Sequence, residues 1–221
     1  MSIGPHNLLL MIVFTGAAVV ILLITTALSS RLEPFLRTWL TGTVIIVLGP
    51  FASAIYYMNL VPWVGALAFS SLVVGIGVKA LAAIQFRTGR LQLGVMAPAM
   101  LAVTAAVTGA IFSGYDGLSI ILWQGWMAAC GLIAAANYHM ARAEAPMPLG
   151  LLTGFYLLYA LAFGLSAATL LADGSLVLGG PPDTFADKVS RVAAVVALLG
   201  CGSMLLVLNH RRSARHAALP A

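Results

Sequence analysis

Long segments without charge determine what this chain can fold into. Several long stretches contain no Asp, Glu, Lys or Arg, among them residues 38–78, 91–115, 145–172 and 192–210. A helix of about 20 apolar residues crosses a bilayer core of about 30 Å. Each stretch is long enough for one crossing, and the first is long enough for two. The sequence therefore predicts a polytopic helical membrane protein.

Composition excludes a soluble domain. Only 8% of the 221 residues are charged, whereas a soluble domain carries about 25%. Breaks with loop chemistry divide the apolar sequence into seven spans. These spans are roughly Leu8–Leu28, Trp39–Tyr57, Trp63–Ile84, Gly94–Phe112, Leu118–Met140, Leu149–Leu171 and Val189–Leu208. We expect an all-α transmembrane bundle of seven helices over residues 1–212 and a short cytoplasmic tail over residues 213–221.

The basic residues predict the orientation of the bundle. With the N-terminus outside, nine of the eleven Lys and Arg residues fall on the cytoplasmic side, and only Lys188 and Arg191 fall outside. Because cytoplasmic loops carry an excess of Lys and Arg, we expect the N-terminus outside and the C-terminus in the cytoplasm. The net charge of +5 is thus a topology signal, so the expected partner is membrane lipid and not nucleic acid.

Lys79 lies well inside its apolar span. At 1.5 Å per residue it is about 24 Å from Trp63, where the span begins on the outer side. We expect its long stem to snorkel to the inner head groups. A retinal-binding lysine, as in microbial rhodopsins, would instead lie midway along the seventh span, where this chain has none.

Signatures of catalysis are absent. The sequence has no GxSxG, HExxH or phosphate-binding glycine loop, so we expect no enzyme activity. No Asp or Glu falls inside a predicted span, which disfavours proton-coupled transport. His139 and His210 fall at inner helix ends, where polar caps are commoner than haem or metal ligands. Cys130 and Cys201 are expected to be core thiols, and no cofactor or metal is predicted.

Aromatic and polar side chains gather in the outer half of the predicted bundle. Such aromatics commonly anchor helices at the membrane interface. Gln124, however, lies well inside its span, where its amide needs a partner, so a pocket for a small apolar or amphipathic ligand is the alternative. The candidate pocket residues are Tyr56, Tyr57, Asn59, Trp63, Trp123, Gln124, Trp126, Tyr156 and Tyr159.

Proline and glycine predict irregular or close-packed helices. Pro50 and Pro98 fall inside the second and fourth spans, where each tends to kink its helix. Structural kinks are the commoner case, and a freed carbonyl beside a cavity is the alternative. Gly150 and Gly154 form a GxxxG pair, which favours packing within the bundle over a homodimer seam.

A resemblance to a known family covers most of the chain. Residues 56–90 read YYMNLVPWVGALAFSSLVVGIGVKALAAIQFRTGR: an outer turn with Pro and Trp, a helix of small and aliphatic residues, then an aromatic and a Gly-Arg pair. This pattern resembles the multi-helix N-terminal membrane sensors of bacterial GGDEF diguanylate cyclases. Residues 36–49 and 113–165 look like further helices of that family. Ser70 and Ser71 stand where the family often has asparagine, and no GGDEF sequence is present.

The resemblance implies a sensory module of the bacterial inner membrane that signals to a cytoplasmic output domain, in cis or in trans. Cyclic-di-GMP chemistry would reside in that output domain. A small transporter or channel is the alternative, although its candidate polar groups, such as Gln85, Gln124 and Asn137, are scattered. A haem protein that uses His139 and His210 is a third class.

Overall fold

Seven helices make up the part of the chain that the structure describes, residues 5–29 and 32–218, and this part contains no strand. The computed structural model places them at α1 (Pro5–Ser29), α2 (Pro34–Asn59), α3 (Pro62–Thr88), α4 (Leu93–Phe112), α5 (Asp116–Met140), α6 (Pro146–Ala172) and α7 (Phe185–Ala218). The all-α prediction is confirmed, and each predicted span lies within one helix.

Local sequence explains several helix boundaries. Pro34, Pro62 and Pro146 occupy the first turns of α2, α3 and α6. The missing N–H costs no helical hydrogen bond there, and the fixed φ suits a helix start. Gly89 ends α3 with a φ of 71°, a left-handed conformation that glycine adopts without strain.

Six of the helices, α2 to α7, are long and apolar enough to cross a membrane. In α1 the described side chains give a shorter apolar stretch, Met11–Leu22. Large apolar side chains such as Phe14, Leu101 and Leu161 are exposed on the outside of the bundle. An apolar surface of this kind suits lipid and not water, so the chain is a helical membrane protein.

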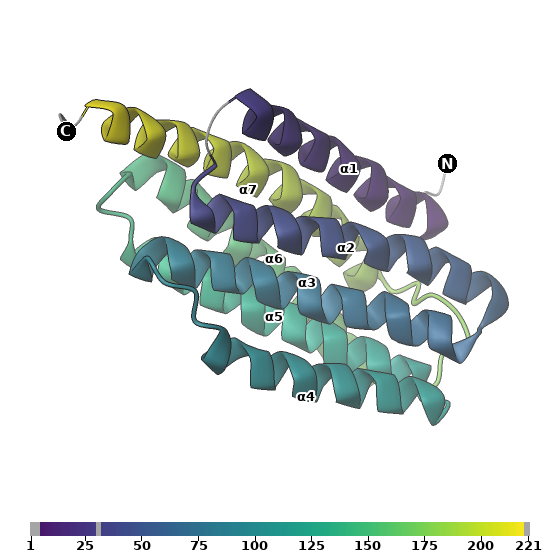
Figure 1. The fold of residues 1–221 in the computed structure, drawn as a ribbon. Helices are drawn as coiled ribbons and strands as arrows, with labels where there is room; N and C mark the ends of the chain where they lie inside the picture. The colour runs from purple at the N-terminus through teal and green to yellow at the C-terminus, as the bar shows by residue number, and fades with distance from the viewer. Residues whose placement is uncertain (1–4, 30–31, 219–221) are drawn as a thin grey trace.

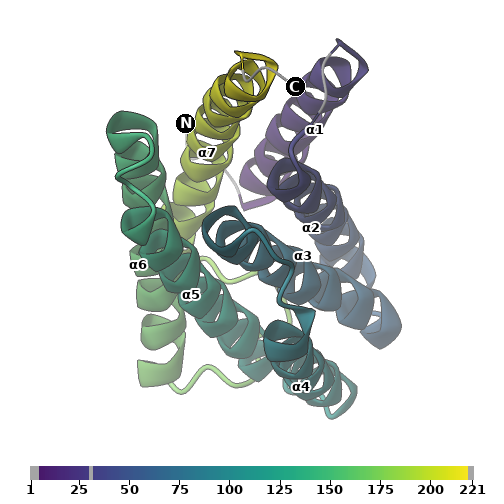
Figure 2. The same cartoon turned by 60° about the vertical axis from the view of Figure 1, so that its left-hand side comes forward.

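Six helices pack as a ring, and α4 lies outside it. α1 packs against α2 and α7, and the ring continues from α2 to α3, α5, α6 and back to α7 (Figures 1 and 2). α4 packs outside the ring against α3 and α5. Successive helices run in opposite directions (Figure 1), so residues distant in sequence meet inside the ring.

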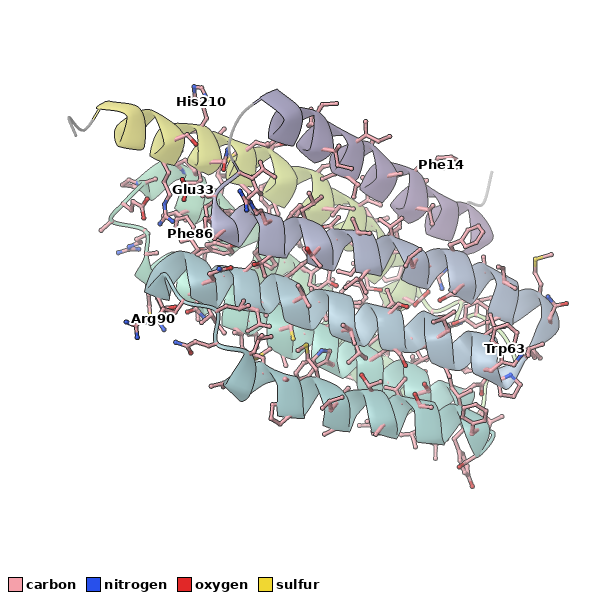
Figure 3. All side chains as sticks on the ribbon, viewed as in Figure 1. Phe14, Glu33, Trp63, Phe86, Arg90 and His210 are labelled. Atoms are coloured by element: carbon pink, nitrogen blue, oxygen red, sulfur yellow. The ribbon has the colours of Figure 1, made fainter. Side chains whose placement is uncertain are left out.

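The two ends of the bundle differ in their side chains. Trp63 lies at the end where α1 begins, and we call this the Trp63 end (Figure 3). Glu33, Arg90 and His210 lie at the opposite end, which we call the His210 end (Figure 3). The residues predicted to lie on the two sides of the membrane, such as Trp63 and Arg90, therefore lie at opposite ends of the bundle.

Gly150 and Gly154 do not pack inside the bundle. Both are exposed on α6, and a Cβ added to either would meet nothing within 4 Å. The expectation of an intramolecular contact at this pair is therefore wrong, and a homodimer seam stays a prediction. Close backbone approach occurs instead between α2 and α3, at Gly42 and Gly75.

Candidate functional site

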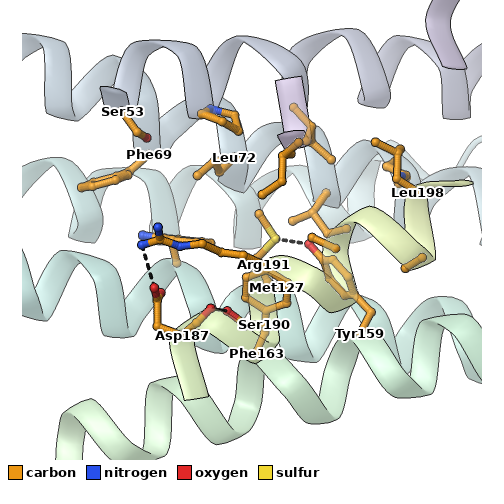
Figure 4. A pocket seen from close by; sticks show the side chains of 18 of the residues that line it. Ser53, Phe69, Leu72, Met127, Tyr159, Phe163, Asp187, Ser190, Arg191 and Leu198 are labelled. Atoms are coloured by element: carbon orange, nitrogen blue, oxygen red, sulfur yellow. Dashed lines mark hydrogen bonds and ion pairs between the residues drawn. The ribbon is translucent and has the colours of Figure 1, made fainter. Parts of the chain in front are cut away.

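A cavity lies inside the helix ring. The centre of a water molecule can occupy about 80 Å³ of it. That volume holds several waters or one small ligand, since one water needs about 10–15 Å³ on this measure. All six ring helices contribute to the wall, which is mostly apolar (Figure 4). Along α7 the lining runs from Asp187 to Cys201, a length of about 20 Å at 1.5 Å per residue.

A buried ion pair lies in the part of the cavity nearest the Trp63 end. Arg191 Nη2 is 2.6 Å from Asp187 Oδ2, one turn away on α7 (Figure 4). Only 3% of Asp187 and 6% of Arg191 is exposed. Gln124 of α5 donates from Nε2 to Asp187 Oδ1 at 3.4 Å. The two opposite charges and the amide compensate one another, which is what allows charge to be buried.

The α6–α7 connection closes over this end. Asp116, at the start of α5, accepts hydrogen bonds from the N–H groups of Leu178 and Gly179 at 2.8 and 2.9 Å. Pro182 of the same connection lines the cavity, and its carbonyl accepts from Arg191 Nη2 at 3.3 Å. The connection is thus fastened both to α5 and to the ion pair.

Aromatic side chains form one wall of the cavity. The Trp123 ring stacks on Phe69, with centroids 6.0 Å apart, and lies 5.8 Å from Phe163. The Tyr159 hydroxyl donates to the Met127 sulfur (Figure 4). Such a wall offers large flat apolar surface to a hydrocarbon chain or an aromatic ring.

Lys79 lines the cavity farther toward the His210 end. Its side chain is buried, with 6% exposed, and Nζ lies 4.3 Å from the centroid of the Trp39 ring. Trp39 Nε1 in turn donates to the Tyr156 hydroxyl at 2.9 Å. The expectation that Lys79 snorkels to the membrane surface is therefore wrong. Gly42 has no side chain, so the lysine stem lies against α2 and stays inside the ring.

Part of the predicted pocket lines this cavity. Four of the nine candidates do so: Tyr57, Trp123, Tyr156 and Tyr159. Gln124 is fully buried behind the wall, and its contact with Asp187 confirms that its amide finds an interior partner. The structure thus brings together candidates from α2, α5 and α6.

The remaining candidates lie elsewhere. Asn59 and Trp63 are exposed at the Trp63 end, Trp63 by 64%. Tyr56 is buried without lining the cavity. Trp126 donates to the Val73 carbonyl at 2.9 Å, which ties α5 to α3. These four residues pack between helices or lie exposed at the end of the bundle, and they do not line the cavity.

The two helix prolines have different surroundings. Pro50 is buried in α2 and lines the cavity. It supplies no N–H to the carbonyl of Ile46, which also lines the cavity. Pro98 is exposed on α4, outside the ring. Only Pro50 fits the expectation of a freed carbonyl beside a cavity.

Asp187 and Arg191, the buried ion pair of the site, are not among the candidates that the sequence predicts. The sequence places Arg191 on the outer side and starts the seventh span at Val189, but α7 begins at Phe185 and buries the side chains of both Asp187 and Arg191 inside the bundle. Asp187 lies two residues ahead of the predicted seventh span, so no carboxylate falls inside that span, but the structure buries this one in the interior. The available signal was the spacing of opposite charges by four residues, which puts them on one helix face.

A second polar cluster ties α7 to its neighbours at the His210 end. Arg212 makes two hydrogen bonds to Glu144, from Nε at 2.8 Å and from Nη2 at 2.7 Å. Its guanidinium lies 4.0 Å from the centroid of the Phe86 ring. Asn209 Oδ1 accepts from the N–H of Glu33 at 2.9 Å. We call Asn209, Arg212 and Glu144 the clasp.

The residues considered for a haem or metal site and for a polar transport path do not come together in the structure. His139 and His210 are both exposed. Within residues 5–29 and 32–218, no three or more His, Cys, Asp and Glu side chains are placed to hold a metal ion. Cys130 and Cys201 are buried free thiols, as predicted. Gln85 and Asn137 do not line the cavity.

Comparison with known proteins identifies no relative. The chain matches no protein-family model, no curated protein and no solved structure. A function must therefore be argued from the cavity, the ion pair and the clasp.

Proposed function

We propose that the chain is a sensory, signal-transducing module of the bacterial inner membrane, with its N-terminus outside and its C-terminus in the cytoplasm. The distribution of basic residues supports this orientation, and the resemblance to GGDEF sensor regions supports the role. The Trp63 end is then outer, and the His210 end faces a cytoplasmic output domain, such as a diguanylate cyclase, in cis or in trans.

The observation that carries the proposal is that α7 belongs both to the cavity and to the clasp. Asp187, Arg191 and Ala197 line the cavity. Farther along the same helix, Asn209 and Arg212 bond to the N-terminal side of α2 and to the α5–α6 connection. One continuous helix therefore links a buried ligand site to the cytoplasmic end, where small helix shifts can be read out.

A ligand would act by favouring one of two packings of α7. It can do so only through different affinities for the two packings. Binding about 100-fold tighter to one packing, equivalent to about 2.7 kcal/mol, moves their ratio from 1:10 to 10:1. The ion pair inside the cavity and the charge-assisted clasp are contacts that can differ between the packings.

The test is to perturb the cavity and measure the His210 end. Spin labels at Arg90→Cys and His210→Cys, both exposed, report the distance between the α3–α4 connection and α7, while the buried Cys130 and Cys201 stay unlabelled. We expect Asp187→Asn to shift the distance distribution. Leu101→Ala, on the lipid-facing side of α4, is the control and should not. Identical distributions for Asp187→Asn and the parent protein would contradict the proposal.

A small transporter is the second candidate, and the buried Asp187 carboxylate favours it. Intramembrane carboxylates commonly mark proton or ion pathways, and Asp187 lies in a cavity. A transporter must open this cavity to each side in turn. Reaction of Ser190→Cys with an impermeant maleimide from both sides of the membrane would support transport, whereas access from the outer side alone or from neither side would favour sensing.

A further inference from the structure

The side chains that line the cavity carry a net charge of one positive unit. Its charged lining residues are Lys79, Asp187 and Arg191. Asp187 and Arg191 neutralise each other at 2.6 Å. In the described part of the chain, the other ion pairs join Lys188 to Asp183 and Arg212 to Glu144, and none involves Lys79. The uncompensated charge is therefore on Lys79.

Protein groups satisfy the ammonium of Lys79 only in part. Only 6% of Lys79 is exposed. The ammonium lies over the face of Trp39, with 4.3 Å from Nζ to the ring centroid. A cation–π contact replaces part of the lost hydration, but a buried charge remains costly until an opposite charge pairs with it.

The surroundings of Lys79 can hold both ends of an amphipathic molecule. The Tyr156 hydroxyl accepts from Trp39 Nε1 and is also hydrogen-bonded to Cys201, whose sulfur is only a weak acceptor, so a carboxylate oxygen competes well for the hydroxyl proton. Both Lys79 and Tyr156 line the cavity, so two donors face one end of it. Beyond them the wall is apolar, with Ile76 and Leu72 one and two turns back along α3.

We propose that the cavity binds a small amphipathic carboxylate, whose head group pairs with Lys79 and whose apolar body lies between α2, α3 and the aromatic wall. The proposal deepens the sensory function above and rests on the same cavity. A single negative charge matches the single excess positive charge. A phosphate would bring more charge and more acceptor oxygens than one lysine and one hydroxyl can satisfy.

The experiment measures binding of octanoate, octanol and octylamine to the purified full chain by calorimetry, with protein-free micelles as the blank. The three molecules share an apolar chain and differ in head-group charge. We expect octanoate to bind at least tenfold tighter than octanol, and octylamine to bind weakest. Equal binding of octanoate and octanol to the parent protein, or no binding of octanoate, would overturn the proposal without any variant.

Variants locate the site. Lys79→Met keeps the length of the stem and removes its charge, so octanoate binding should weaken at least tenfold while octanol binding stays unchanged. Lys188→Met, which removes a lysine from a surface pair, is the matched control and should bind octanoate as the parent does. Unchanged octanoate binding by Lys79→Met overturns the assignment. Unchanged octanol binding by the same variant shows that it is folded.

The outcomes separate this proposal from the sensory function. Octanoate binding without a change in the distance between labels at positions 90 and 210 would leave the carboxylate site standing and refute the sensory role. A distance change in Asp187→Asn without octanoate binding would refute the ligand class alone.

Discussion

Gly42 and Gly75 bring the backbones of α2 and α3 into contact beside the cavity. A Cβ on Gly42 would lie 2.7 Å from the Gly75 carbonyl oxygen and 2.8 Å from Lys79 Cγ. Real Cβ atoms do not approach backbone so closely, so any larger residue must push the helices apart. The place of Lys79 over the Trp39 ring therefore depends on the absence of a side chain at position 42.

Substitution at Gly42 should destabilise the bundle. Gly42→Ala inserts a methyl group against backbone, and overpacking of this kind costs about 1–3 kcal/mol. Gly150→Ala is the matched control, because its Cβ would meet nothing within 4 Å and alanine is favoured in helices by about 1 kcal/mol. Thermal unfolding in one detergent should show a lower Tm for Gly42→Ala only. Equal Tm values would show that α2 and α3 separate without cost.

The ion pair in the cavity should show strong coupling. Asp187→Leu or Arg191→Met alone leaves a buried charge unpaired, with an expected loss of about 3–5 kcal/mol. The double variant should recover most of that loss, because it leaves no buried charge. Asp183→Ala, which breaks the exposed pair with Lys188, should cost less than about 1 kcal/mol. The free energies of unfolding provide the measurement, and additive losses at positions 187 and 191 would argue against a compensated pair.

Asp116 should hold the α6–α7 connection over the cavity. Asp116→Ala removes the acceptor for the Leu178 and Gly179 N–H groups, so both amides should exchange their hydrogens faster. Asp173→Ala, an exposed residue next to the same connection, should leave that exchange unchanged. Hydrogen exchange followed by mass spectrometry checks this, and unchanged protection in Asp116→Ala would show that other contacts hold the connection.

The clasp should depend on the planar geometry of Arg212. Arg212→Lys keeps the charge but loses the paired hydrogen bonds to Glu144, and the partial exposure of both side chains limits the loss to about 1 kcal/mol. Amide exchange in residues 141–145 should rise. Arg211→Lys, on an exposed neighbour, is the control. The same exchange rates in both variants would mean that Arg212 contributes charge and no geometry.

Labelling from one side of the membrane should establish the orientation. Leu91→Cys and Val177→Cys place exposed thiols at opposite ends of the bundle, whereas the native Cys130 and Cys201 are buried. In intact cells with a permeable outer membrane, an impermeant maleimide should label position 177. Position 91 should react only after the inner membrane is opened. The reverse pattern would invert the proposed topology.

The sequence by itself determined the helices of this protein. Charge-free stretches such as residues 145–172 require a membrane-spanning helix because backbone groups in lipid must bond within their own segment. Prolines such as Pro62 and Pro146 then mark where helices begin. The interior partner of Gln124 was also predictable, since an isolated amide in an apolar span is costly. Each of these inferences uses only local sequence and the physics of the bilayer.

Only the tertiary structure decided which side chains share the cavity. Hydropathy does not say how a uniformly apolar helix is rotated, so the inward direction of Lys79 and Arg191 was not readable from their spans. The approach of α2 to α3 at Gly42 keeps Lys79 inside, and the early start of α7 carries Asp187 inward. These positions follow from contacts between helices distant in sequence, which is why the charged content of the cavity emerged only with the fold.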